Sequence, residues 1–197
     1  GDVDGDGLVD LLVAAPGAQG GTGEAEVWLG DAGGLMGDSG RLGGRLPGDA
    51  AGAAVSAGDV DGDGQVDAAI GIPTDITGGL RGLVAVHAGP LQGANATTDD
   101  AVARIHGRTP TGQTGASVDL DGDVNGDGMA DLVVGSPMEG AGEVAIWFGP
   151  VTGDQQLEEA DRRYIGDGVA YEVGRRVAWA GDTDGDGGDD LVVGAPQ

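Results

Sequence analysis

The sequence predicts an all-β protein, a partial β-propeller of about three to four blades, in which each blade is a four-stranded antiparallel sheet. Two observations lead to this prediction. The pattern D-x-D/N-G-D-G-x-x-D occurs four times at a spacing of about 60 residues, which indicates a repeated structural unit. Each period also contains short apolar stretches bounded by glycine and proline, without a convincing amphipathic helix, and this is typical of propeller blades.

The acidic pattern divides the chain into repeats at about residues 1–58, 59–122 and 123–181, followed by a partial repeat at 182–197. Residues 1–197 are therefore expected to form one propeller segment. The chain begins inside a repeat, at Gly1-Asp2, without a methionine. We expect it to be a fragment of a larger propeller or one half of an oligomeric propeller.

Each acidic loop leads into a short apolar stretch that ends in proline, and such stretches are typical of buried strands. A glycine-rich turn, a second strand, a weaker third strand and a strand entering the next loop complete the period. The expected strands lie at 11–16, 24–29, near 41–42 and 53–57, then at 68–73, 83–88, near 104–105 and 116–120, then at 132–137, 143–148, near 163–164 and 175–180, and finally at 191–196. Counted from the first loop, these make three strands of one blade, two complete blades and the inner two strands of another.

Carboxylates at positions one, three, five and nine of a tight glycine-bearing loop form an oxygen cage suited to Ca²⁺, whereas Mg²⁺ prefers fewer carboxylates and more water. A backbone carbonyl at position seven would add a ligand. The predicted ligands are Asp2, Asp4, Asp6, Leu8 and Asp10; Asp59, Asp61, Asp63, Gln65 and Asp67; Asp123, Asn125, Asp127, Met129 and Asp131; and Asp182, Asp184, Asp186, Gly188 and Asp190. We expect about four Ca²⁺ ions per chain, one in each loop.

Two other interpretations of the loops were weighed. An acidic, solvated turn without metal is disfavoured because like charges this close repel one another. An EF-hand loop also begins D-x-D-x-D-G, but it needs flanking helices and a carboxylate at position twelve. That position is apolar in every copy, where it is Val13, Ile70, Val134 or Val193.

Composition restricts the function further. The formal net charge is −25, so binding to nucleic acid or to an anionic membrane is disfavoured. No apolar run approaches the ~18 residues of a membrane span. The chain has no cysteine and two histidines, and its carboxylates are already assigned to metal, so we do not expect an enzyme.

After each acidic loop comes a Gly-Ala-Pro-like end, and with it the chain resembles the FG-GAP repeats of integrin α-subunit β-propellers. The ends are Ala14-Ala15-Pro16, Gly71-Ile72-Pro73, Gly135-Ser136-Pro137 and Gly194-Ala195-Pro196. The glycine of the "FG" half corresponds to Gly115 and Gly174. The resemblance implies that each calcium loop joins the two innermost strands of a blade, and that a closed ring has about seven blades.

The resemblance also implies an extracellular or cell-surface module for adhesion or protein recognition, with an unidentified protein ligand. Two alternatives remain open, namely a non-catalytic propeller domain attached to a surface enzyme, and a structural spacer. The sequon Asn95-Ala96-Thr97 is a candidate glycosylation site if the host glycosylates. Because an open arc leaves unpaired strand edges, we expect the isolated chain to form a head-to-tail homodimer that completes a ring.

Overall fold

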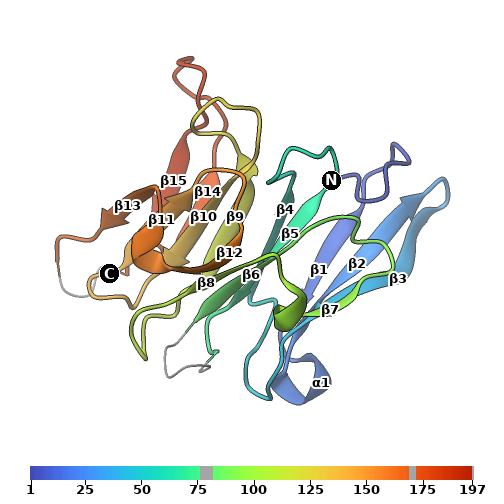
Figure 1. Ribbon diagram of the computed structural model, residues 1–197, viewed down its shortest axis with the longest axis horizontal. Coiled ribbons are helices and arrows are strands. Elements are labelled where there is room, and N and C mark those ends of the chain that lie inside the picture. The colour runs from blue at the N-terminus through green and yellow to red at the C-terminus, as the bar shows by residue number, and fades with distance from the viewer. Residues whose placement is uncertain (76–81, 169–171, 197) are drawn as a thin grey trace.

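The computed structural model describes residues 1–75, 82–168 and 172–196, and in these residues the chain is built almost entirely from β-strands (Figure 1). In the described residues, helical structure is restricted to the four-residue α1 (Ala18–Gly21) and two 3-10 turns, η2 (Thr98–Asp100) and η3 (Leu157–Glu159). The strands of this described part form four sheets that stand side by side. The predicted all-β class is therefore confirmed.

The two central sheets are complete blades. One contains β4 (Ala54–Gly58), β5 (Asp67–Ile72), β6 (Leu83–His87) and β8 (Ala103–His106), and the other contains β9 (Ser117–Gly122), β10 (Asp131–Ser136), β11 (Glu143–Trp147) and β13 (Arg162–Ile165). Within each blade, successive strands pair antiparallel. This is the four-strand order expected from the sequence.

The outer two sheets are partial blades in the described residues. The first contains β1 (Leu11–Ala15), β2 (Glu24–Asp31) and β3 (Gly34–Gly43), and the last contains β14 (Arg176–Trp179) and β15 (Leu191–Gly194). Every strand expected from the sequence is present, with β3 longer than its weak pattern indicated. In the described part of the chain, no helix has the length and apolar character needed to span a lipid bilayer.

The middle strands of the complete blades are buried along their whole length, which explains their continuous apolar sequences. Their side chains fill the spaces on both sides of the blade. Ile70 and Ile72 pack in one core cluster with the first blade, whereas Leu120 and Leu132 belong to a second cluster between the two complete blades. Burying both faces of a sheet in this way requires blades on both sides of it.

Paired glycines let neighbouring blades approach closely at the Gly-x-Pro ends. A Cβ atom on Gly135 would lie 2.0 Å from the carbonyl oxygen of Gly174, and one on Gly71 would lie 2.1 Å from that of Gly115. Gly115 and Gly174, whose carbonyl oxygens make these close approaches, have positive φ values of 85° and 86°, a conformation that favours glycine. The two halves of the repeat motif, far apart in sequence, therefore meet where one blade packs on the next.

Two short strands were not expected from the sequence. β7 (Asn95–Thr97) pairs in parallel with β3, and β12 (Gly153–Gln156) pairs in parallel with β8. Each comes from the segment that joins the third and fourth strands of a blade, and it crosses back to pair with the outermost strand of the preceding blade (Figure 1). Three or four partly exposed residues without an apolar pattern give no strand signal.

Candidate metal centre

The four acidic loops lie at the same end of the blades. The loops at 59–67, 123–131 and 182–190 each join the first strand of a blade to its second, and the loop at 2–10 precedes β1, the second strand of its blade. Backbone hydrogen bonds link the last three loops, and the first and second loops line a common pocket. The Ala130 amide donates to the Asp59 carbonyl (2.9 Å), and the Asp189 amide donates to the Asp123 carbonyl (3.0 Å). The loops therefore form a continuous row at one end of the array.

The first aspartate of each loop organises the turn. In the first loop the amides of Gly5 and Asp6 donate to Asp2 Oδ1 (2.8 and 3.1 Å), and the amide of Gly7 donates to Asp2 Oδ2 (2.9 Å). Asp59, Asp123 and Asp182 accept the same three bonds in the other loops. Folding the backbone around one carboxylate turns the following carboxylates toward a common centre.

Glycines supply the backbone conformation that this turn needs. The glycine at the sixth position of each loop has a positive φ, a conformation that favours glycine, with values of 87°, 85°, 89° and 98° at Gly7, Gly64, Gly128 and Gly187. The fourth-position glycines also have a positive φ, between 72° and 81°. The strict D-x-D/N-G-D-G spacing therefore reflects the backbone as well as the carboxylates.

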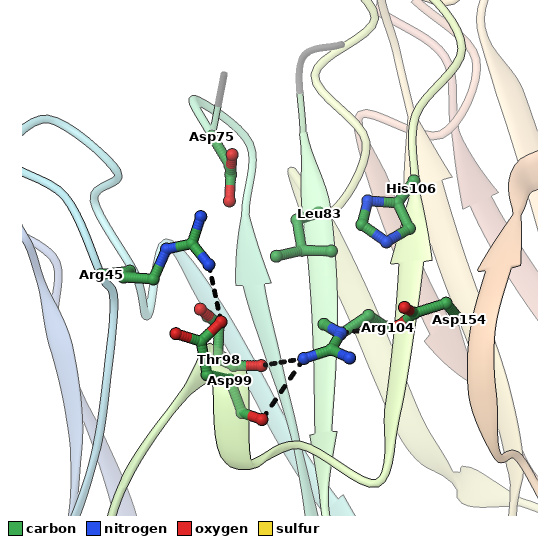
Figure 2. Close-up of a pocket in the computed structure, with 8 residues that line it drawn as sticks. All are labelled: Arg45, Asp75, Leu83, Thr98, Asp99, Arg104, His106 and Asp154. Carbon is green, nitrogen blue, oxygen red and sulfur yellow. Dashed lines mark hydrogen bonds and ion pairs between the residues drawn. The ribbon is translucent and has the colours of Figure 1, made fainter. Parts of the chain in front are cut away.

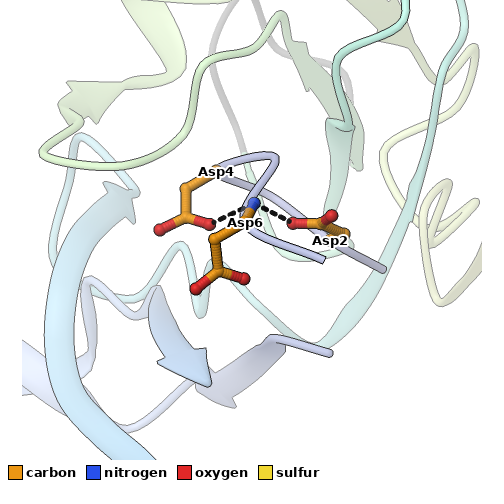
Figure 3. A group of neighbouring side chains, drawn as sticks. All are labelled: Asp2, Asp4 and Asp6. Carbon is orange, nitrogen blue, oxygen red and sulfur yellow. Dashed lines mark hydrogen bonds between the residues drawn. The ribbon is translucent and has the colours of Figure 1, made fainter. Parts of the chain in front are cut away.

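Three of the four loops bring three carboxylates together. In the first loop, one oxygen from each of Asp2, Asp4 and Asp6 lies within 4.8 Å of the others (Figure 3). The corresponding trios in the other loops are Asp59, Asp61 and Asp67, and Asp182, Asp184 and Asp190. Such an arrangement suits a single hard divalent cation, because it concentrates negative oxygen ligands around one point.

The remaining predicted ligands are placed as follows. Asp63 and Asp186 do not belong to the trios of their loops, and neither does Asp10. At position seven, the amide donates to the fifth-position aspartate in every loop, with Leu8, Gln65, Met129 and Gly188 as the donors at 2.8–3.0 Å. These bonds fix the peptide units whose carbonyls are predicted ligands, and metal ligation by them stays a prediction.

The third loop differs from the other three. Within the described residues, it does not form a trio of carboxylates of this kind, and Asn125 stands where the other loops have aspartate. The Asn125 amide group donates to Asp127 Oδ2 at 2.8 Å, so the two side chains remain together in the loop. With one negative charge fewer, this loop is the weakest candidate for a cation.

The ninth-position aspartate has a structural role that the sequence interpretation missed. Asp10 is buried and accepts from the Val3 amide (2.6 Å) and from the Gly30 amide (2.7 Å) at the end of β2. Asp67 and Asp131 make the same two bonds, to Val60 and Gly89 and to Val124 and Gly149. Gly30, Gly89 and Gly149 recur in the sequence at the end of the second expected strand of each repeat. This recurrence was the signal from which the contact could have been predicted.

These two bonds tie the loop to the next hairpin, and they leave lone pairs on both carboxylate oxygens for a metal. Burial raises the pKa values of Asp67 and Asp131 above the usual range for aspartate, partly offset by the two backbone amides. At Asp190, hydrogen bonds from the hydroxyl and amide of Thr183 lower the pKa instead. The ninth carboxylate is thus in different surroundings in the last loop.

The fold and the row of acidic loops define a repeat protein of the β-propeller class, in which each described acidic loop leads into the second strand of a blade. Comparison with known families agrees. Residues 2–70 match the FG-GAP-like repeat and residues 111–147 match the FG-GAP repeat. The chain belongs to the FG-GAP repeat family, as the sequence resemblance implied.

Integrin α-subunits are among its relatives. Integrin alpha-PS2 of Drosophila melanogaster is 31% identical over 212 residues, covering 99% of this chain and 14% of the relative. Integrin alpha-PS5 of the same species is 31% identical over 149 residues, covering 74% of this chain and 15% of the relative. Human integrin alpha-X is 33% identical over 149 residues, with 73% and 13% covered. The chain thus spans about one seventh of the length of these relatives.

Proposed function

We propose that this chain is a calcium-binding β-propeller module that acts outside the cell or at its surface in adhesion or protein recognition, without catalytic activity. The observation that carries the calcium assignment is the repeated trio of carboxylates within 4.8 Å of one another. The similarity to integrin α-subunits supports the recognition role and the extracellular location.

The donor set fits Ca²⁺ better than the alternatives. All the side chains predicted as metal ligands would bind through oxygen, and in three loops they are all carboxylates. Zinc and copper, in contrast, favour nitrogen and sulfur ligands. Ca²⁺ accepts six to eight oxygens in flexible geometry, which matches a loop offering four side chains and a carbonyl. A bound divalent ion would offset the repulsion between the aspartates and stabilise the end of each blade.

Calorimetric titration of the purified chain with CaCl₂ tests the assignment site by site. Asp184→Ala is expected to lower the number of bound ions by one, because it removes one carboxylate of the fourth trio. Asn125→Asp is expected to raise the affinity of the third loop by adding a negative charge. Asp154→Asn, which removes a carboxylate far from the loops in sequence and on β12, serves as the control and should leave the titration unchanged.

The titration also tests the proposed location. Calcium sites of extracellular modules have Kd values of roughly 10⁻⁴ to 10⁻³ M, whereas those of cytosolic buffers are near 10⁻⁸ M. Sub-micromolar affinity would contradict the extracellular assignment while leaving the calcium assignment intact. Absence of heat together with absence of metal after dialysis against calcium would contradict the calcium assignment itself.

We also propose that the isolated chain forms a homodimer through its open blades. In the described residues no strand lies beyond β15 on one side or beside the inner edge of β1 on the other. Apolar side chains are exposed nearby, including Val192 (59%), Ile165 (60%) and Leu11 (43%). Unpaired edges with apolar neighbours favour association, and a second copy of the same arc offers matching blade faces.

Light scattering in millimolar calcium is expected to give twice the mass of one chain. Ile165→Lys combined with Val192→Lys places two charges on the exposed apolar surface and should shift the protein toward monomer. A monodisperse monomer of the unaltered chain would contradict the dimer, and would leave the calcium assignment untouched.

A further inference from the structure

Three equivalent positions in the blades differ in one informative way. In the hairpin that follows each of the first three acidic loops, the first residue of the second strand pairs with the residue before the proline that follows the first strand. The pairs are Ala15↔Glu24, Ile72↔Leu83 and Ser136↔Glu143. The side chains at this position are therefore glutamate, leucine and glutamate. The middle blade alone has an apolar residue where its neighbours have a carboxylate.

In the third blade, this glutamate is held between two arginines. Glu143 is fully buried, with Oε1 2.5 Å from Nε of Arg163 and Oε2 2.5 Å from Nη2 of Arg108. Arg163 lies on the same blade, whereas Arg108 follows β8 of the preceding blade. A second buried carboxylate, Glu139, lies 3.7 Å from Arg108 Nε. One junction between blades is thus closed around a carboxylate.

The corresponding junction between the first two blades has the same two arginines without the glutamate. Arg45 and Arg108 both stand in a Gly-Arg-x-Pro sequence after the outermost strand of a blade. Arg104 pairs with Ala85 in the sheet as Arg163 pairs with Ala145. Leu83 takes the place of Glu143, and a cavity of about 280 Å³ opens beside it (Figure 2).

The groups around this cavity can receive a carboxylate. Arg45 is held by Asp99 (2.6 Å) and Arg104 by Asp154 (2.6 Å), which fixes both guanidinium groups at the cavity wall. Within the described residues, Nη2 of Arg104 and the ring of His106 make no hydrogen bond, so both retain donor capacity. Thr98 adds a hydroxyl to the lining. These are the donors that recognise an oxyanion.

The local charge explains the expected strength of binding. Asp75, Asp99 and Asp154 line the cavity together with the two arginines, so an added carboxylate enters a site already rich in acid. The neighbouring junction tolerates this situation, because Glu139 and Glu143 are both buried beside Arg108. Binding is therefore expected to be weak, in the range that NMR titration detects.

We propose that the cavity between the first two blades is a binding site for a carboxylate group of the size of a glutamate side chain. The internal repeat itself shows the ligand chemistry, because the same pair of arginines encloses Glu143 in the next junction. The cavity follows the far end of β5, opposite the acidic loop that precedes this strand. The site is thus separate from the proposed calcium sites and goes beyond the proposed function.

Titration of the ¹⁵N-labelled, calcium-saturated chain with propionate tests the site, because propionate reproduces the end of a glutamate side chain. Saturable shifts are expected at the amides of Thr98, Arg104 and His106. Propionamide, the neutral analogue, should give none of them. Absence of saturable shifts with propionate, or equal shifts with propionamide, would overturn the proposal.

Two variants locate the binding. Leu83→Glu supplies the carboxylate from within the chain and is expected to abolish the propionate shifts while raising the melting temperature above that of Leu83→Gln. Arg104→Gln removes one guanidinium and should weaken propionate binding at least several-fold. Unchanged propionate binding in both variants would place the ligand elsewhere and overturn the assignment.

Peptides distinguish the source of the carboxylate. A blocked Gly-Glu-Gly peptide that shifts the same amides, when its Gln counterpart does not, supports an acidic side chain of a protein partner. Propionate binding without peptide binding supports a small free carboxylate. If neither ligand binds in a sample whose calcium titration is normal, the cavity proposal fails while the calcium proposal stands.

Discussion

Removal of calcium with EGTA is expected to lower the melting temperature of this chain by on the order of 15 °C. At ~1 mM Ca²⁺ and a Kd of ~0.1 mM, each site contributes about 1.4 kcal/mol to the free energy of unfolding. Four independent sites would contribute roughly 6 kcal/mol, which is comparable to the whole stability of many domains. The physical reason is that each loop holds three or four carboxylates close together in sequence, and these repel one another without a cation.

The measurement is thermal unfolding followed by circular dichroism in three solutions, which contain calcium, EGTA alone, or EGTA with excess Mg²⁺. Asp184→Ala provides an internal control, since a chain with one site fewer should lose about one quarter less stability on chelation. Identical melting curves in calcium and in EGTA would contradict a structural role for the ions. Recovery of the full melting temperature with Mg²⁺ alone would show that the loops do not prefer Ca²⁺.

Glu143→Gln is expected to lower the free energy of unfolding by about 2–4 kcal/mol. The substitution keeps the shape of the side chain but removes the charge that two arginines share, at 2.5 Å from each. Breaking a buried ion pair typically costs ~3–5 kcal/mol, and the lower range applies because Arg108 and Arg163 are 34% and 26% exposed. The hydrogen bond to Glu143 also raises the pKa of Arg163.

Urea denaturation of Glu143→Gln and Asp154→Asn provides the comparison. Asp154 makes an equally direct ion pair with Arg104, but it is 58% exposed, so its loss should cost at most about 1 kcal/mol. Equal effects of the two substitutions would contradict the special importance of the buried cluster. A change in the urea m-value would indicate that the folded state itself had changed.

Much of the blade architecture could be predicted because its determinants are local and repeated. The acidic loops, the apolar stretches and the Gly-Ala-Pro-like ends recur in register, so a weak signal in one copy is supported by the others. The fully buried strands β5 and β10 carry continuous apolar runs that need no tertiary information to recognise. The other strands of the blades, apart from β7 and β12, could be predicted from the same repetition.

What escaped prediction depends on contacts between repeats. β7 and β12 are strands because an edge of the preceding blade offers hydrogen bonds, and nothing in their own sequences requires an extended conformation. The cluster around Glu143 joins residues from two blades, so its members are scattered over more than fifty positions. The double role of Asp10 likewise depends on Gly30, which only folding brings beside it.

The parallel pairing of β7 with β3 and of β12 with β8 has a consequence for motion. Successive blades are joined near their first strands, where β9 contacts both β4 and β14, and the first three blades are joined again at their outer edges by these returning strands. A blade that is attached to its neighbour at both its inner and outer edges cannot rotate about a hinge at one edge alone. Displacement of any one of the first three blades must therefore be transmitted to its neighbour, and the acidic loops of these three blades should move as a single rigid unit.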